Sequence, residues 1–483
     1  MLFRQTLLYL PAQVLGPLFQ FISIVAWTHA LSPIEMGVFA LVVAVQEFAY
    51  TATTFWFSLY TQRYHDPGAD AETRRRFLDT ELGVLACASL ATAAVVLLLP
   101  VVTSVVWTWP LALATVAYAV SRGLVTHLSD RARTEHDTLT YSVLQITWPV
   151  LGLISGWMLA QLVSPTADMV LAGYALAQFV SLGAPLLRLD FGRDPFAYSR
   201  EAIATALRYG LPLLAGGLFV WVAGNGLRFV VEYRESAAAV GLITVGWGLG
   251  LRVAGFASML VTAAAFPVAM RRARDEGMAA GQAQLERNGI LLLAILAPAC
   301  VGLFAISEPF VRLVVAQEFQ AMTIAVLPLA IAAGAFRNFR IHFGEQVFLL
   351  HERPGIPLWN DAIDAVTSLV GGALGLLWGG LPGAVAGAAL GSFISLVVTL
   401  ASGWVAYRFA FPVPALLRIG LATLAMWLVV SSLHVLPGAF SVAIAVAIGA
   451  VVYGGVLMLI FPELARKIAG LLARNRSATE SVT

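Results

Sequence analysis

Two ionisable side chains lie inside hydrophobic stretches of the sequence, where charge is least expected. Glu47 falls near the middle of the stretch 35–58, and Arg252 falls near the middle of 238–268. An ionisable group at the centre of a bilayer costs from about 2.5 to more than 10 kcal/mol and usually faces a cavity or a partner. Because a guanidinium binds anionic oxygens through paired hydrogen bonds, we predict that both residues face a cavity and approach each other in one conformation. The alternative is a fixed buried ion pair that only sets the geometry of the helices.

Four further arginines lie toward the ends of hydrophobic stretches. Arg228 occupies the outer third of 205–231, whereas Arg122, Arg337 and Arg340 lie at the inner ends of their stretches. Long cationic side chains in such places often extend to the lipid headgroups. Each is therefore predicted either to snorkel in this way or to line a transport pathway. In the second case Arg228 and Arg122 would line the cavity of the pathway, and Arg337 and Arg340 would line its inner vestibule.

Two aspartates at the start of the stretch 358–379 are a further candidate site. Asp361 and Asp364 are three residues apart and therefore share one face of a helix. They could pair with the inner arginines or bind a coupling cation. The third interpretation is a solvated helix start that Asn360 caps.

The motifs of several enzyme classes are missing from the sequence. Lys467 is the only lysine, so there is no G-K-[ST] phosphate loop, and the seven histidines form no H-E-x-x-H. The two cysteines, Cys87 and Cys300, lie in separate apolar stretches, where we expect packing rather than a disulfide or a metal site. A net charge of +2 does not indicate a nucleic-acid partner. We expect no enzyme activity, no cofactor and no metal.

The composition is that of a protein embedded in lipid. Hydrophobic residues make up 59% of the 483 residues and charged residues only 12%, about half the charged fraction of a soluble domain. A transmembrane helix needs roughly 17–25 apolar residues. On this template the sequence predicts fourteen spans, at about 6–28, 35–58, 80–104, 108–128, 140–161, 168–188, 205–231, 238–268, 288–306, 322–343, 358–379, 382–407, 413–433 and 440–461.

The positions of the basic residues predict the orientation of these spans. With the N-terminus in the cytoplasm, 25 of the 29 basic residues fall on the cytoplasmic side, as the positive-inside rule requires. Both termini are then cytoplasmic. The outer loops are only a few residues long, so no external domain is expected.

A weak internal repeat divides the spans into halves. Pro11 opens the first span and Gly37 follows it by 26 residues; Pro212 opens the seventh and Gly241 follows it by 29. Two related six-helix halves are typical of transporters. The predicted domains are an N-terminal six-helix lobe at 1–190, a C-terminal six-helix lobe at 191–410, two further helices at 411–462 and a cytoplasmic tail at 463–483.

The repeat also relates the two central charges. Glu47 lies ten residues beyond Gly37, and Arg252 lies eleven residues beyond Gly241. The two side chains are therefore predicted to lie at matching depths on corresponding helices of the two lobes.

Short segments spread along the chain carry a family pattern. They are Leu31–Phe39 (LSPIEMGVF), Leu207–Pro212 (LRYGLP), Ala265–Pro267 (AFP), Ser307–Arg312 (SEPFVR) and Gln317–Phe319 (QEF). Through them the sequence resembles, over about residues 5–460, the bacterial polysaccharide flippases. That family belongs to the superfamily that also holds the multidrug (MATE) exporters and the lipid II flippase.

The resemblance implies an all-α, MATE-like integral membrane protein of the bacterial cytoplasmic membrane, with two six-helix lobes around a cavity and two extra C-terminal helices. It implies alternating access that carries an undecaprenyl-diphosphate-linked oligosaccharide to the outer leaflet, for O-antigen or exopolysaccharide synthesis. The expected partners are this lipid-linked oligosaccharide, membrane lipids and other polysaccharide-assembly proteins. The substrate diphosphate would compete with Glu47 for Arg252.

Three other functions are open. A drug exporter of this fold would commonly carry an acidic residue in span 1 or in spans 7 to 8, but span 1 has none and span 7 has none before Glu232. A lipid II flippase would be expected to carry more cationic charge in span 1. A membrane glycosyltransferase or polymerase would usually need a large external loop, which this sequence lacks.

Overall fold

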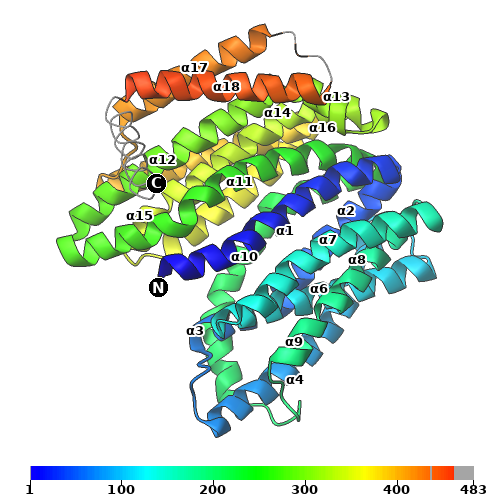
Figure 1. The fold of residues 1–483 in the computed structure, drawn as a ribbon. Coiled ribbons are helices and arrows are strands. Elements are labelled where there is room, and N and C mark those ends of the chain that lie inside the picture. The colour runs from blue at the N-terminus through cyan, green and yellow to red at the C-terminus, as the bar shows by residue number, and fades with distance from the viewer. Residues whose placement is uncertain (1, 434, 436–437, 462–483) are drawn as a thin grey trace, which may run out of the picture. The chain divides into compact units, whose positions relative to one another are not determined.

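The structure is a computed structural model that describes residues 2–433, 435 and 438–461. All the regular elements in these residues are helical, and twelve helices among them are long and apolar enough to cross a membrane. The predicted all-α, multi-pass membrane architecture is confirmed. The helices of the N-terminal half are α1 (Leu2–Ala30), α2 (Pro33–Tyr50), the π-helix η1 (Thr51–Phe55), α3 (Trp56–Tyr64), α4 (Ala71–Leu97), α5 (Leu99–Val102), α6 (Trp109–Thr134), α7 (Thr138–Leu162), α8 (Ala167–Ser181), α9 (Gly183–Arg188) and α10 (Arg200–Arg234) (Figure 1).

The helices of the C-terminal half are longer on average. They are α11 (Ala237–Glu276), α12 (Met278–Ala305), α13 (Ser307–Val314), α14 (Gln317–Phe339), the π-helix η2 (Arg340–Gly344), α15 (Gln346–Leu350), α16 (Gly355–Tyr407), α17 (Val413–Ser432) and α18 (Ala439–Ile460).

A break inside α16 brings the number of spans to about the fourteen predicted. The backbone leaves helical geometry at Gly379 and Gly380, where Gly380 has a φ of +59°, a conformation that glycine adopts without steric cost. The two arms on either side are separate spans, with the boundary where the sequence predicts it. The remaining span is α1, in which Val14–Ala30 is an apolar helical segment.

Capping residues fix where several helices begin. The Ser32 hydroxyl accepts a hydrogen bond from the backbone N–H of Glu35, and Pro33 occupies the first turn of α2. Thr108 and Asp137 cap α6 and α7 in the same way. Such caps satisfy N–H groups that have no partner within the helix.

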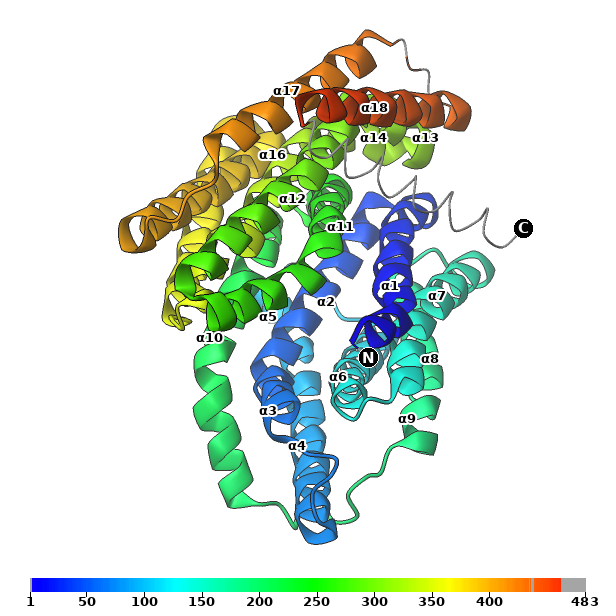
Figure 2. The same ribbon diagram turned by 60° about the vertical axis from the view of Figure 1, so that its left-hand side comes forward.

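The chain divides into two compact units, each built from three segments. Unit 1 comprises Met1–Leu249, Val315–Val326 and Leu358–Gly391, and unit 2 comprises Gly250–Val314, Leu327–Pro357 and Ser392–Thr483. Within unit 1, α7 packs along α8 and α1, and α6 packs against α8 and α4 (Figures 1 and 2). Within unit 2, α17 and α18 pack against each other and α17 packs along α12. The predicted lobes stay a prediction, and the predicted tail lies outside the described residues.

Reciprocal glycine contacts join the starts of α2 and α11, inside unit 1. A Cβ on Gly37 would lie 1.8 Å from the carbonyl oxygen of Ala237, and a Cβ on Gly241 would lie 2.0 Å from that of Pro33. Ala237 follows Pro33 by 204 residues and Gly241 follows Gly37 by the same 204 residues. The contact is therefore the same in both directions, as at a two-fold axis. The two glycines of the predicted repeat therefore meet in space.

Close backbone packing also joins the arms of α16 on its unit 1 side. A Cβ on Gly371 would lie 2.4 Å from the carbonyl oxygen of Gly387, and one on Gly375 would lie 2.0 Å from that of Gly383. Glycines at four-residue spacing let helices approach in this way.

Candidate functional site

A polar chain of three side chains links α2 and α10 within the hydrophobic part of unit 1. The Asn225 amide nitrogen donates a hydrogen bond of 3.0 Å to Glu47 Oε2. The Asn225 amide oxygen accepts a hydrogen bond from Arg228 Nη1. Asn225 is buried, whereas Glu47 is exposed on the surface of the protein. The structure thus brings together two of the predicted site residues, Glu47 and Arg228, through an amide whose bridging role the sequence does not reveal.

Aromatic residues hold this polar chain in place. The Trp221 indole N–H donates a hydrogen bond of 2.8 Å to the Ala44 carbonyl, and its ring lies 5.1 Å from that of Phe48. These contacts come one helical turn before Asn225 and on both sides of Glu47. They fix the register of α10 against α2, so that the amide can reach the carboxylate.

The chain of groups balances one negative charge against one positive charge. Hydrogen bonds to charged groups are stronger than those between neutral groups, and in the low dielectric of a membrane an unpaired charge is costly. The asparagine oxygen accepts a hydrogen bond from one N–H group of the Arg228 guanidinium. A phosphate oxygen has the chemistry to replace it there, because guanidinium binds phosphate through paired N–H groups.

Arg122 lies near the middle of α6. Because α6 runs on to Thr134, Arg122 is thirteen residues from the start of the helix and twelve from its end. Its guanidinium lies 3.9 Å from the centroid of the Trp148 ring on α7, a cation–π contact. Its predicted place at the inner end of the span and the snorkelling interpretation stay predictions.

Arg252 lies on α11 in unit 2, whereas Glu47 lies in unit 1. Around Arg252, α11 packs tightly on α14: a Cβ on Gly250 would lie 2.6 Å from Ala330 Cβ, and one on Gly334 would lie 3.1 Å from Leu251 Cα. The predicted approach of Arg252 to Glu47 stays a prediction.

Arg337, near the end of α14, and Arg340, the first residue of η2, have partners within unit 2. Arg337 Nη2 donates to the Ser392 hydroxyl at 3.3 Å. Arg340 is 1% exposed and forms an ion pair with the buried carboxylate of Glu345. Arg340 therefore does not snorkel, which corrects one interpretation of its position, and a vestibule role for either arginine stays a prediction.

The aspartates of α16 are not a solvated helix start. The helix begins at Gly355, a full turn before Asn360, so Asn360 does not cap it. Asp364 is 1% exposed and accepts a hydrogen bond of 3.0 Å from the Ser368 hydroxyl. Asp361 is half-buried. The interpretation of a capped, solvated start is wrong, whereas a cation-binding or pairing role stays a prediction.

A buried polar network in unit 1 is missing from the predicted site. His127 and Arg131 on α6 both bind the carboxylate of Glu81 on α4, at 2.9 Å and 2.6 Å. Arg131 also binds Glu135 at 2.9 Å, and Glu135 binds His65 at 3.0 Å. His127, Arg131 and Glu135 recur every four residues and so share one helix face. That spacing is the sequence feature that could have revealed the network.

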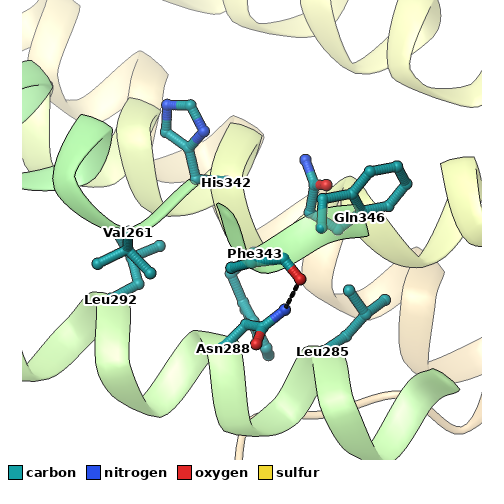
Figure 3. A pocket seen from close by; sticks show the side chains of 9 residues that line it. Val261, Leu285, Asn288, Leu292, His342, Phe343 and Gln346 are labelled. Atoms are coloured by element: carbon teal, nitrogen blue, oxygen red, sulfur yellow. Dashed lines mark hydrogen bonds between the residues drawn. The ribbon is translucent and has the colours of Figure 1, made fainter. Parts of the chain in front are cut away.

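The hollows of unit 2 differ in size and chemistry. A small void of about 10 Å³ lies between α11, α12 and η2, where Asn288 donates to the Ala265 carbonyl at 2.8 Å while the His342 ring points away from Asn288 (Figure 3). It has room for about one water molecule. A second hollow of about 390 Å³ is an apolar groove between α12 and α17, with Gly420 and Trp427 in its wall.

A family model described as "Polysaccharide biosynthesis protein" matches residues 28–324. None of the curated protein sequences matches the chain. The solved structures that are similar include the inward closed conformation of the lipid II flippase MurJ, at 14% identity and a TM-score of 0.69, covering 95% of this chain and 100% of that one.

Two multidrug transporters are similar as well. An inward-facing MATE family transporter has 15% identity and a TM-score of 0.53, covering 86% of this chain and 98% of that one. A mutant of the Vibrio cholerae MATE transporter VcmN has 15% identity and a TM-score of 0.51, covering 84% and 96%. At these identities the likeness shows the fold alone, and the predicted MATE-like fold is confirmed.

Proposed function

The chain belongs to the polysaccharide biosynthesis protein family, and from this premise we propose that it is a flippase for an undecaprenyl-diphosphate-linked oligosaccharide. It carries this substrate from the cytoplasmic to the outer leaflet by alternating access, without catalysing a reaction. The product feeds surface polysaccharide synthesis, and other assembly proteins are its partners.

The observation that carries the proposal is the polar chain of Glu47, Asn225 and Arg228. A carboxylate and a guanidinium placed within membrane-spanning helices usually mark a substrate or ion pathway. An arginine there can bind a diphosphate that crosses with its lipid carrier. When Arg228 is occupied by phosphate, the Asn225 oxygen is released and the amide stays bound to Glu47.

Arg252 and Arg122 complete the proposed substrate path. Arg252 supplies a second guanidinium from the C-terminal lobe, and Arg122 presents its cation from the middle of α6. The inner residues Arg337, Arg340, Asp361 and Asp364 are proposed for the vestibule or for coupling.

The lipid part of the substrate needs an apolar path. The groove between α12 and α17 has a volume of about 390 Å³. Of the residues that line it, Thr423 and Trp427 carry a polar group on the side chain, and the others are apolar. Such a surface suits a polyprenyl chain, since burying each CH₂ group contributes about 0.8 kcal/mol.

The proposed setting is the bacterial cytoplasmic membrane, with both termini in the cytoplasm. The proposed architecture is the pair of lobes at 1–190 and 191–410, followed by α17 and α18. The reciprocal contact between Gly37 and Gly241 supports it, because related halves make such a contact at their common axis.

A deletion and complementation experiment tests the function. The gene is deleted in its host and restored as wild type, Arg228→Ala, Arg252→Ala, or the exchange of Glu47 and Arg252. The matched control is Arg312→Ala, which removes an exposed arginine whose i,i+4 partner is Glu308. Surface polysaccharide, lipid-linked oligosaccharide and the amount of membrane-inserted protein are measured.

The expected result is loss of polysaccharide and accumulation of the lipid-linked precursor in the deletion. Arg228→Ala and Arg252→Ala should each lower export about tenfold or more at normal protein levels, because a hydrogen bond to a charged group contributes about 1.5–3 kcal/mol. Arg312→Ala should behave as wild type. Rescue by the exchanged pair would make Glu47 and Arg252 a structural ion pair. Normal polysaccharide with raised drug sensitivity would instead identify a drug exporter.

A further inference from the structure

We propose that His127 and Glu81 form a buried proton-binding site, through which a proton gradient drives the carrier. This inference rests on the proposed function and names its coupling ion. The site lies wholly within unit 1, and none of its residues belongs to the polar chain of Glu47, Asn225 and Arg228.

The geometry fixes which nitrogen of His127 carries hydrogen. Glu81 forms an ion pair with Arg131, and an ionised carboxylate can only accept hydrogen bonds. His127 Nε2, at 2.9 Å from Glu81, must therefore carry a hydrogen. The opposite nitrogen, Nδ1, lies 2.8 Å from the Ser58 hydroxyl and accepts from it. That nitrogen is the one position of the ring that can take up a further proton.

A path of hydroxyl groups leads to this nitrogen. The Tyr50 hydroxyl lies 3.1 Å from the Ser58 hydroxyl, and Tyr50 is half-buried, whereas Ser58 and His127 are fully buried. In the proposed step Ser58 passes its hydroxyl hydrogen to His127 Nδ1 and takes one from Tyr50. Tyr50 takes its replacement proton from a hydronium ion, which becomes a water molecule. Only a proton moves, and it ends on the imidazole ring.

The charges of the network favour the uptake of one proton. Arg131 is one cation shared between two carboxylates, since it binds Glu81 and Glu135. With both histidines neutral this group has a net charge of −1, and one proton on His127 or His65 brings it to zero. Arginine does not release its proton in proteins, so no proton passes through Arg131 from one histidine to the other. A proton on one histidine still disfavours a proton on the other, because both belong to the same charged group.

Other charged groups near His127 have partners of their own. Asp130, one turn along α6, pairs with Arg133 at 3.9 Å. On α4, Asp79 accepts two backbone N–H groups of the loop that follows α9, at 2.7 Å and 3.1 Å. The Arg131 guanidinium also donates to the Asp190 carbonyl of that loop, at 2.6 Å. The imidazole ring itself stacks on Phe57 at 5.8 Å.

A π-helix lies between the two hydroxyl groups of the path. η1 spans Thr51–Phe55, and Tyr50 precedes it while Ser58 follows it. Short π-helical segments occur often at functional sites. Conversion of η1 to α-helical hydrogen bonding would turn Ser58 by about 100° about the helix axis, and this would break its bonds to Tyr50 and His127. Proton uptake is thereby linked to the conformation of the helix that carries Glu47.

The test measures protonation and transport separately. Full-length protein with ¹⁵N-labelled histidine is placed in lipid nanodiscs, and His127→Gln identifies the signals of His127 among the seven histidines. We expect these signals to change from the neutral tautomer to imidazolium as the pH falls through the histidine range of about 8 to 5.

Transport is measured in the deletion strain. His127→Gln keeps a donor and an acceptor for its two neighbours but cannot titrate, and it should lower polysaccharide export at least about tenfold at normal protein levels. The matched control is His342→Gln, a change at a histidine of unit 2. Ser58→Ala breaks the path without touching the ring, and it should also lower export, which keeps the test valid if His127→Gln does not fold.

Three results would overturn the inference. The first is a His127 ring that keeps one protonation state over this pH range. The second is wild-type export by His127→Gln, and the third is export by wild-type cells that persists when nigericin collapses the pH gradient. Failure of the proposed function is a different outcome, because the deletion would then leave polysaccharide normal while the NMR titration of His127 could still succeed.

Discussion

Replacement of Asn225 by leucine tests the polar chain most directly. Leucine has as many side-chain heavy atoms as asparagine and branches at the same carbon, but it offers no hydrogen-bonding group. It removes the bond of 3.0 Å to Glu47 and the bond to Arg228. Each bond to a charged group contributes about 1.5–3 kcal/mol. Because Glu47 is exposed, we take the lower value for each, which gives a loss of about 3 kcal/mol.

The assay is the free energy of unfolding of purified protein in mixed detergent micelles. Asn338→Leu is the matched control, because that asparagine donates only to the Gly334 carbonyl of its own helix, at 2.9 Å. We expect the control to lose about 1 kcal/mol or less. The same variants are then compared for polysaccharide export.

A double-mutant cycle between Glu47→Gln and Arg228→Gln sharpens this test. In the wild-type background the two changes should be coupled by about 0.5–3 kcal/mol, as residues of one hydrogen-bond network are. With Asn225→Leu present the coupling should fall to near zero. Equal coupling in both backgrounds, or a loss in Asn225→Leu no greater than in the control, would refute the bridging role of Asn225.

Three further predictions concern packing, lipid binding and acid. Gly37→Leu should abolish monodisperse protein in size-exclusion chromatography, since even a Cβ there would lie 1.8 Å from a carbonyl oxygen of α11; a monodisperse variant would contradict this packing. Gly420→Phe should fill the groove and lower export, because Gly420 lines the groove. Gly455→Phe on α18 is the matched control and should leave export unchanged; an added Cβ meets open space at both positions, so neither change disturbs the packing of its helix at that atom. Burial raises the pKa of Glu135, but hydrogen bonds from a histidine and an arginine outweigh it and hold the pKa below its ordinary value of 4.5. Its carboxylate therefore adds stability above pH 4.5 that is lost as the pH falls through the lowered pKa, and Glu135→Gln should flatten the fall of the thermal midpoint in acid.

The positions of the membrane-spanning helices could be predicted from hydropathy because few backbone conformations are stable in a membrane. In lipid each N–H and C=O group must be bonded within the segment, so a long apolar stretch has to be a helix. The division of 358–379 from 382–407 was predictable for the same reason, with Gly379 and Gly380 between the two arms. An error arose where polar residues extend a helix beyond its apolar part, as at Asn360 in α16.

The candidate residues were predictable only in part. Glu47 stands out in the sequence because an ionisable group among apolar residues is costly. Glu81 lies next to the predicted start of a span, where charge is ordinary, and so it gave no such indication. The structure shows that it is 1% exposed and bound to His127 and Arg131.

The sequence by itself thus determined the helical membrane architecture, the approximate spans and the residues whose charge needs an explanation. The partners of those residues were decided by tertiary structure. Asn225 is 178 positions from Glu47, and His127 is 69 positions from Ser58. Hydrophobicity and helix formation are local properties that a window of residues reveals. A hydrogen bond between distant helices depends instead on how those helices pack, since packing sets their depth and rotation.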